Sequence, residues 1–227
     1  MKTSKIIFFS LLSAIGLIIL IAFVDIAIKS HNRPEIKVNK QLLPAFTIIC
    51  ANNSNFNLMQ GDSSFIETAY VKDSIPPHLN YTIKGDTLVV SDITQSNKTN
   101  SYPSIKIFST DSLNSIILKN SNINIMRLKS VKMTLNVDNS YVWFNQDNVN
   151  LSSFSSLEIL AKNHSNINAT SFKIDNLSIN LHKSEADLAI MAGKINGTLS
   201  DSSRVSTRLS GEISLKADRT SMVSINE

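Results

Sequence analysis

A serine recurs through the second half of the chain at a nearly constant interval, at positions 121, 140, 165, 184, 203 and 221. The successive intervals are 19, 25, 19, 19 and 18 residues. Two positions after each serine stands a small or branched apolar residue, and the alternation usually continues at the fourth position. A fixed period of this length is typical of repeat proteins, in which each unit contacts only its neighbours.

Each unit is predicted to contain two short strands joined by a polar corner. Pairs such as Asn120-Ser121, Asn139-Ser140 and Thr220-Ser221 form the corners. Their side chains bond to nearby backbone, and Asn and Asp tolerate left-handed backbone angles. An apolar residue about eight positions before each serine opens the unit: Leu113, Val131, Leu157, Leu177, Ile195 and Ile213. So short a unit cannot bury its own apolar face, and we expect the units to stack into a solenoid.

The predicted fold class is all-β, a single-stranded β-solenoid (β-helix-like) over residues 44–227. Residues 111–227 supply about six rungs, and the segment 145–150 is expected to bulge from one of them as a loop. Residues 44–110 form a less regular opening part. Short apolar runs predict its strands at 46–50, 56–59, 65–71, 79–84, 87–90 and 105–108.

The N-terminal region carries nineteen uncharged residues from Ile6 to Val24. About 20 apolar residues are needed to span a bilayer as a helix, and a cleaved signal peptide has a shorter apolar core. We therefore predict a transmembrane signal anchor over 6–28, preceded by a cytoplasmic segment 1–5 and followed by a juxtamembrane linker 29–43. The expected location is a membrane, crossed once, with the C-terminal domain on the periplasmic or cell-surface side.

The basic charge does not indicate nucleic acid as a partner. The chain has 22 basic and 18 acidic residues, a formal net charge of +4. Much of the excess flanks the apolar segment, at Lys2, Lys5, Lys29, Arg33, Lys37 and Lys40. That is the distribution of membrane-flanking charge, so the predicted partner is the lipid bilayer through residues 6–28, and no nucleic acid.

The sequence contains no recognisable catalytic or metal-binding motif. The four histidines, His31, His78, His164 and His182, stand in separate contexts without ligand spacing. The serines are explained by corner chemistry, and the carboxylates are scattered over different rung positions, whereas a carbohydrate-cleaving enzyme needs carboxylates that converge. We predict no catalytic residue, no metal, no cofactor and no enzyme activity.

Two aromatic residues give the best candidate for a binding site. Tyr141 and Trp143 flank Val142, and alternation along a strand puts neighbours on opposite faces. If Val142 and Phe144 point inward, as the repeat requires, Tyr141 and Trp143 point outward and present rings on which a sugar can stack. The alternative is ordinary packing of the two rings under the segment 145–150.

The order of these features resembles the bacterial auto-transporter adhesin head domains, or GIN domains. An opening strand at 46–50 is followed by Met59-Gln60-Gly61-Asp62, by the segment Tyr81–Val90 with Lys84-Gly85-Asp86, and finally by the serine-corner repeats. The resemblance covers residues 44–227. Asn, Asp, Lys or Ser replaces the glycine that the family carries at its corners, which marks a divergent member. The resemblance implies a β-solenoid in the cell envelope and transfers no catalytic residue.

Three functional hypotheses follow from the sequence. The first is a non-enzymatic, membrane-anchored envelope protein that presents the solenoid for adhesion or for binding a glycan or a protein. The second is a membrane scaffold that forms a homo-oligomer through the open C-terminal edge of the solenoid, where Met222–Glu227 continue the strand pattern. The third is a carbohydrate-active enzyme.

Overall fold

The structure is a computed structural model that describes residues 2–31, 34–93, 103–145, 152–208 and 211–226. The chain divides into two compact units. Unit 1 comprises Met1–Ile36 with Val71–Asp73, and unit 2 comprises Lys37–Tyr70 with Ser74–Glu227. The predicted loop over 145–150 lies almost wholly outside the described residues.

Unit 1 contains the helix α1, Lys2–His31. Its apolar side chains between Leu11 and Val24 are exposed. Among the described residues, no helix reaches the length and apolar character required to cross a membrane. The structure therefore confirms a single N-terminal helix and gives no support to the prediction that residues 6–28 are a transmembrane anchor.

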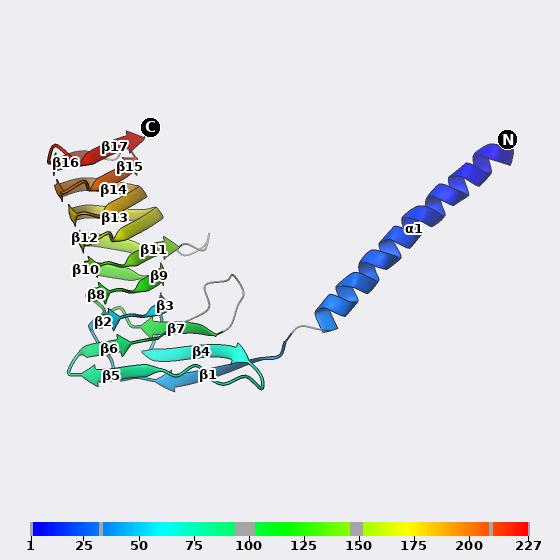
Figure 1. Cartoon of the computed structure of the whole chain (residues 1–227), viewed down its shortest axis with the longest axis horizontal. Coiled ribbons are helices and arrows are strands. Elements are labelled where there is room, and N and C mark those ends of the chain that lie inside the picture. Colours follow the sequence, from blue (N-terminus) through cyan, green and yellow to red (C-terminus); the bar gives the residue numbers. More distant parts are fainter. Residues whose placement is uncertain (1, 32–33, 94–102, 146–151, 209–210, 227) are drawn as a thin grey trace. The chain divides into compact units, whose positions relative to one another are not determined.

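The described residues after α1 form seventeen strands (Figure 1). Strand β1 lies within the segment 29–43, where we predicted only a linker. The strands are β1 Ile36–Leu42, β2 Ile48–Asn52, β3 Asn55–Gln60, β4 Phe65–Val71, β5 Asn80–Lys84, β6 Thr87–Ser91, β7 Ser104–Ser109, β8 Ser115–Lys119, β9 Asn122–Met126, β10 Lys129–Asp138, β11 Tyr141–Asn145, β12 Ser153–Lys162, β13 Asn166–His182, β14 Glu185–Ser200, β15 Arg204–Arg208, β16 Glu212–Ala217 and β17 Met222–Asn226.

Unit 2 is a β-solenoid with two parallel faces, seen as stacked rungs in Figure 1. Face A consists of β6, β2, β8, β10, β12, the C-terminal halves of β13 and β14, and β16, in that order. Face B consists of β7, β3, β9, β11, the N-terminal halves of β13 and β14, β15 and β17. The predicted β-solenoid arrangement is confirmed.

The opening end of unit 2 departs from the parallel pattern. Strand β4 pairs antiparallel with β7, and β5 pairs antiparallel with β6. The β5–β6 hairpin turns at Gly85, whose φ of 61° favours glycine. These antiparallel strands lie at one end of the stack in Figure 1. The opening end of unit 2 is therefore antiparallel, whereas the rungs are parallel.

A column of serines lies at the corner where each rung passes from face A to face B, and all of its members except the half-buried Ser221 are buried. The backbone N–H of Ser121 donates to the Oγ of Ser140 at 2.9 Å, and the same bond recurs from Ser140 to Ser165 at 3.3 Å and from Ser165 to Ser184 at 3.2 Å. Most of these hydroxyls also donate to a carbonyl two or three residues earlier. We call this column the serine ladder. Its members are Ser54, Ser121, Ser140, Ser165, Ser184, Ser203 and Ser221.

Most of the corner residues before these serines adopt left-handed backbone angles, as the sequence predicts, and Thr220 is an exception. Asn120 has φ of 49°, Asn139 of 46° and Asn163 of 57°. Lys183 and Ser202, which lack the tolerance of Asn and Asp, also have positive φ, at 50° and 65°. The corner geometry is thus imposed by the ladder even where the local residue does not favour it.

The core lies between the two faces, and every second side chain of a strand points into it, as the alternation in the sequence predicts. Val142 and Phe144 are buried, as are Ile167 and Ala169 on the next rung. Val131 is the exception among the residues expected to open each unit, because its side chain is 79% exposed. Met133 takes the inward position instead, in register with Leu157 of β12.

Candidate functional site

The two predicted site residues point outward from face B. Tyr141 and Trp143 are 45% and 44% exposed, whereas Val142 between them is fully buried. Their rings stack with centroids 5.5 Å apart and an angle of 20° between the planes. We call this pair the aromatic platform. The alternative, packing beneath residues 145–150, lies outside the described residues except at Asn145.

The register places asparagines on both sides of the aromatic platform. Tyr141 pairs with Asn122 of β9 and with Asn166 of β13. Trp143 pairs with Asn124 of β9 and Asn168 of β13. Because the strands are parallel and in register, the outward side chains form two columns that run along the stack. We call these four residues, Asn122, Asn124, Asn166 and Asn168, the asparagine frame.

Trp143 interrupts an amide ladder. The Nδ2 of Asn124 donates to the Oδ1 of Asn57 on β3 at 3.1 Å, as stacked asparagines do when they form ladders. The next position in this column is Trp143, whose side chain offers one indole donor in place of an amide. The Oδ1 of Asn124 is buried and has no hydrogen-bond partner among the described residues. A buried acceptor without a partner costs about 1–3 kcal/mol.

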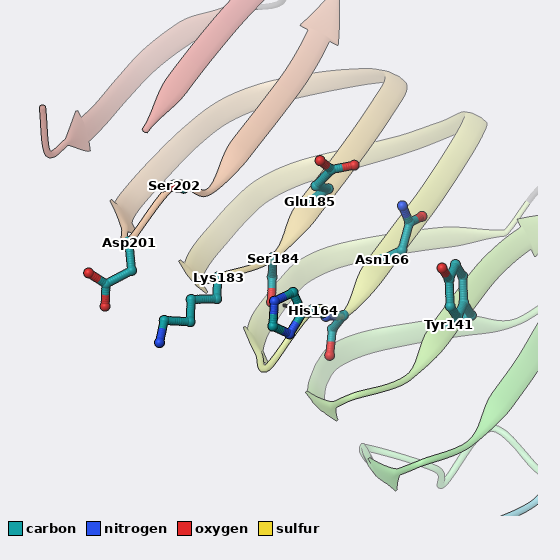
Figure 2. Close-up of a pocket in the computed structure, with 9 residues that line it drawn as sticks. Tyr141, His164, Asn166, Lys183, Ser184, Glu185, Asp201 and Ser202 are labelled. Atoms are coloured by element: carbon teal, nitrogen blue, oxygen red, sulfur yellow. Dashed lines mark hydrogen bonds between the residues drawn. The ribbon is translucent and has the colours of Figure 1, made fainter. Parts of the chain in front are cut away.

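A shallow pocket adjoins the platform at the corner edge of face B (Figure 2). Its volume is about 450 Å³, and Tyr141 lies at one side of it in the view of Figure 2. We call it the corner pocket. It is lined by Tyr141, His164, Ser165, Asn166, Lys183, Ser184, Glu185, Asp201 and Ser202.

The corner pocket combines an aromatic ring with polar and charged groups. Its two carboxylates have cationic or polar neighbours outside the pocket. The Oδ2 of Asp201 lies 3.0 Å from the Nδ1 of His182, and the Oε1 of Glu185 lies 3.9 Å from Arg204. Sequence reasoning did not anticipate this pocket, because its lining comes from three successive corners. The only signal was the repeated position of residues 164, 183 and 202 just before a ladder serine.

Ser200, His182 and Asp201 lie close together at the end of face A, but their geometry is not that of a catalytic triad. The Nδ1 of His182 lies 3.2 Å from the Oγ of Ser200 and 3.0 Å from Asp201. In a triad, the aspartate and the nucleophile contact opposite ring nitrogens, so that the histidine can accept a proton from one side while held from the other. Here both contacts fall on the same nitrogen. Within the described residues, no group of three or more His, Cys, Asp or Glu side chains is placed to hold a metal ion.

Comparison with known proteins supports the fold. No family model matches the sequence, and no curated protein matches it. A solved structure described as a "putative adhesin" from Bacteroides fragilis aligns with a TM-score of 0.57 and 13% identity, over 85% of this chain and 97% of that one. A "putative lipid binding protein" from Parabacteroides distasonis aligns with a TM-score of 0.56 and 14% identity, over 85% of this chain and 97% of that one.

At these identities the likeness establishes a shared fold and nothing finer. The predicted resemblance is therefore confirmed as a fold shared with a structure described as a "putative adhesin". Membership of the GIN family is not established, because no family model matches.

Proposed function

We propose that this chain is a non-enzymatic cell-envelope protein whose solenoid binds glycans through the aromatic platform. The observation that carries the proposal is that Tyr141 and Trp143 stand in two columns whose adjacent positions are asparagines. The rungs on both sides have asparagine in the same two columns. A pair of half-exposed aromatic rings set in a frame of amides suits a sugar, whose C–H faces stack on rings and whose hydroxyl groups exchange hydrogen bonds with amides.

The cost of Trp143 to the fold supports a binding role for this residue. Asparagine at this position would continue the amide ladder, whereas tryptophan leaves the Oδ1 of Asn124 without a partner in the described chain. Folding alone therefore gives no reason for tryptophan in this column. Residues that break a local structural rule without a compensating gain in stability are commonly functional.

The charged residues near the platform favour binding over catalysis. Glu185 and Asp187 continue the two columns on β14, and both side chains are exposed. A carboxyl group that acts as a general acid needs an apolar environment to keep its proton near neutral pH. The two similar solved structures, described as a "putative adhesin" and a "putative lipid binding protein", are also described as binding proteins.

The test is a glycan-array screen of the full-length protein in a sugar-free detergent. The paired variant is Tyr141→Asn/Trp143→Asn, which replaces the platform with the residue found on the adjacent rungs. The matched control is Met222→Asn, because Met222 occupies the same column as Tyr141 on β17 and is also exposed. We expect glycan binding that the paired variant loses and the control keeps. Equal binding by the paired variant would refute the proposed site.

The location at a membrane is proposed from the sequence. The uncharged segment Ile6–Val24 and its flanking basic residues favour attachment of the chain through residues 6–28, with the solenoid outside the cytoplasm. Cell fractionation, with alkaline carbonate extraction, tests the attachment. Added protease tests the orientation, because it should degrade the solenoid in spheroplasts. Recovery of the intact chain in the soluble fraction would refute the attachment.

A second candidate function is self-association through the last rung. In the described chain, β16 pairs only with β14 and β17 only with β15, and Met222 and Ile225 are 54% and 48% exposed. An exposed strand edge with apolar side chains favours pairing with another chain. Light scattering over a range of concentrations distinguishes this candidate, since a monomer at high concentration would exclude it.

A further inference from the structure

The asparagine frame lies above and below the platform along the stack rather than beside it along the strand. Asn122 and Asn124 come from β9, and Asn166 and Asn168 come from β13, the two strands that pair with β11. All four residues are half-buried. The Oδ1 of Asn124 is itself buried and its Nδ2 donates to Asn57, so Asn122, Asn166 and Asn168 are the members of the frame whose amides a ligand can use. The hydrogen-bonding groups available to a bound molecule therefore extend parallel to the solenoid axis.

The spacing of the rungs matches the repeat of an extended sugar chain. Neighbouring strands lie ~4.8 Å apart, which is close to the length that one pyranose ring adds to an extended glycan. A chain that stacks one ring on the aromatic platform would place the sugars before and after that ring over β9 and β13. A chain that ran along the strand would leave the asparagine frame at Asn145.

The charge along the two columns selects against an acidic ligand. From β3 to β13 the outward positions of the columns hold only asparagines and the platform. The next rung carries Glu185 and Asp187, both exposed. Glu185 lies 3.9 Å from Arg204, whereas Asp187 forms no ion pair within the described residues. A carboxylate or sulfate on the sugar over β13 would therefore approach the carboxylates of Glu185 and Asp187, and Arg204 offsets only the charge of Glu185.

We infer that the platform binds a neutral oligosaccharide that lies parallel to the solenoid axis, with one ring on Tyr141 and Trp143 and its neighbours over the asparagine frame. This inference rests on the proposed function and adds the class and the direction of the ligand. Discrimination between sugars then depends on the amides of Asn122, Asn166 and Asn168. Rejection of acidic sugars depends on Glu185 and Asp187.

The experiment measures the affinity of the full-length protein, in a sugar-free detergent, for soluble oligosaccharides. The probes are neutral series built on glucose, mannose and N-acetylglucosamine, from monosaccharide to hexasaccharide, and oligogalacturonates of the same lengths. The variants are Asn168→Ala, the charge-removing pair Glu185→Gln/Asp187→Asn, and the control Asn136→Ala, which changes an outward asparagine on face A.

We expect the affinity for one neutral series to rise at least about tenfold, or ~1.4 kcal/mol, between the monosaccharide and the trisaccharide and then to level off. Asn168→Ala should remove most of that rise, and Asn136→Ala should not. Oligogalacturonates should bind at least about tenfold more weakly than neutral chains, and the charge-removing pair should reduce this difference.

Each contrary result identifies what is wrong. A monosaccharide that binds as tightly as the trisaccharide would overturn the axial placement and leave the proposed function standing. Oligogalacturonates that bind as tightly as neutral chains would overturn the selection by charge. Binding of no glycan at any length would overturn the proposed function together with this inference.

Discussion

Trp143 of β11 stands in parallel register with Asn124 of β9, and the Oδ1 of Asn124 is buried without a hydrogen-bond partner in the described chain. On the other side, the amide of Asn124 donates to Asn57 at 3.1 Å. The column thus contains an amide ladder that stops at the tryptophan. At this position, the residue that would continue the ladder differs from the residue on which the proposed glycan binding depends.

Trp143→Asn should therefore preserve or raise stability. A new amide in this column can donate to Asn124, which recovers about 1–3 kcal/mol, while the lost ring stacking with Tyr141 costs about 0.5–1.5 kcal/mol. Trp143→Ala loses the stacking without providing the donor. Urea denaturation should rank Trp143→Asn above Trp143→Ala in unfolding free energy, and the reverse order would contradict the ladder argument.

The serine ladder predicts a large effect from a small change at Ser165. Its Oγ accepts the backbone N–H of Ser140 and donates to the carbonyl of Lys162. Ser165→Ala leaves that buried N–H without its acceptor, which costs about 1–3 kcal/mol. The control Ser178→Ala changes a half-buried serine on face A and should stay within about 0.5 kcal/mol of the parent. Thermal unfolding should give a lower melting temperature for Ser165→Ala than for Ser178→Ala. Equal melting temperatures would mean that the ladder bonds contribute little to stability.

Lys183 should tolerate asparagine better than a β-branched residue. Its φ of 50° lies in the left-handed region, where Asn is accommodated and a β-branched side chain is strained. We expect Lys183→Val to lower the unfolding free energy by about 1–2 kcal/mol and Lys183→Asn to leave it unchanged or higher. If both variants were equally stable, the corner would have to relax to another backbone conformation.

Asp218 makes the last described corner sensitive to acid. The backbone N–H of Asp201, the hydroxyl of Ser221 and the N–H and hydroxyl of Thr220 all bond to its carboxylate, and these bonds hold the pKa of Asp218 far below its ordinary value. Because the pKa of this carboxyl is lower in the folded state, its ionised form stabilises the fold at pH values above the unfolded pKa of about 3.9. That stabilisation is lost as the pH falls toward the folded-state pKa. Asp218→Asn should thus lower the melting temperature at pH 7, and the difference from the parent should shrink below about pH 4. A pH-independent difference would show that charge is not the cause.

The repeat was predictable because its signal is local and regular. The ladder serines follow from the repeat, and the inward positions of Val142 and Phe144 follow from alternation along the strand; the structure confirms both. Ser54 was missed although Asn53-Ser54 is followed by Phe56 and Leu58 in the same pattern. Its bond to Ser121 spans 67 residues, because the opening strands interrupt the period, and no fixed-interval search detects such a member.

One other feature, the inward residue of β10, depended on register between rungs, which the sequence does not fix at that position. Val131 and Met133 both fit an apolar opening position, and only the pairing with β12 decides that Met133 points inward. The outward direction of Tyr141 and Trp143 was predicted, but their asparagine neighbours were overlooked. The alignment of Ser121, Ser140 and Ser165 already places asparagine one and three positions after the serine on the adjacent rungs, which is the register that the structure shows.

Intrinsic fluorescence tests the central claim most directly, because Trp143 is the only tryptophan in the chain. The measurement is a titration of the full-length protein with the neutral oligosaccharide that binds best on the array, recorded as tryptophan emission. The glycan-platform account predicts a saturable change in emission whose midpoint equals the dissociation constant from calorimetry. Calorimetric binding of the same oligosaccharide with unchanged tryptophan emission would place the glycan elsewhere and contradict the account.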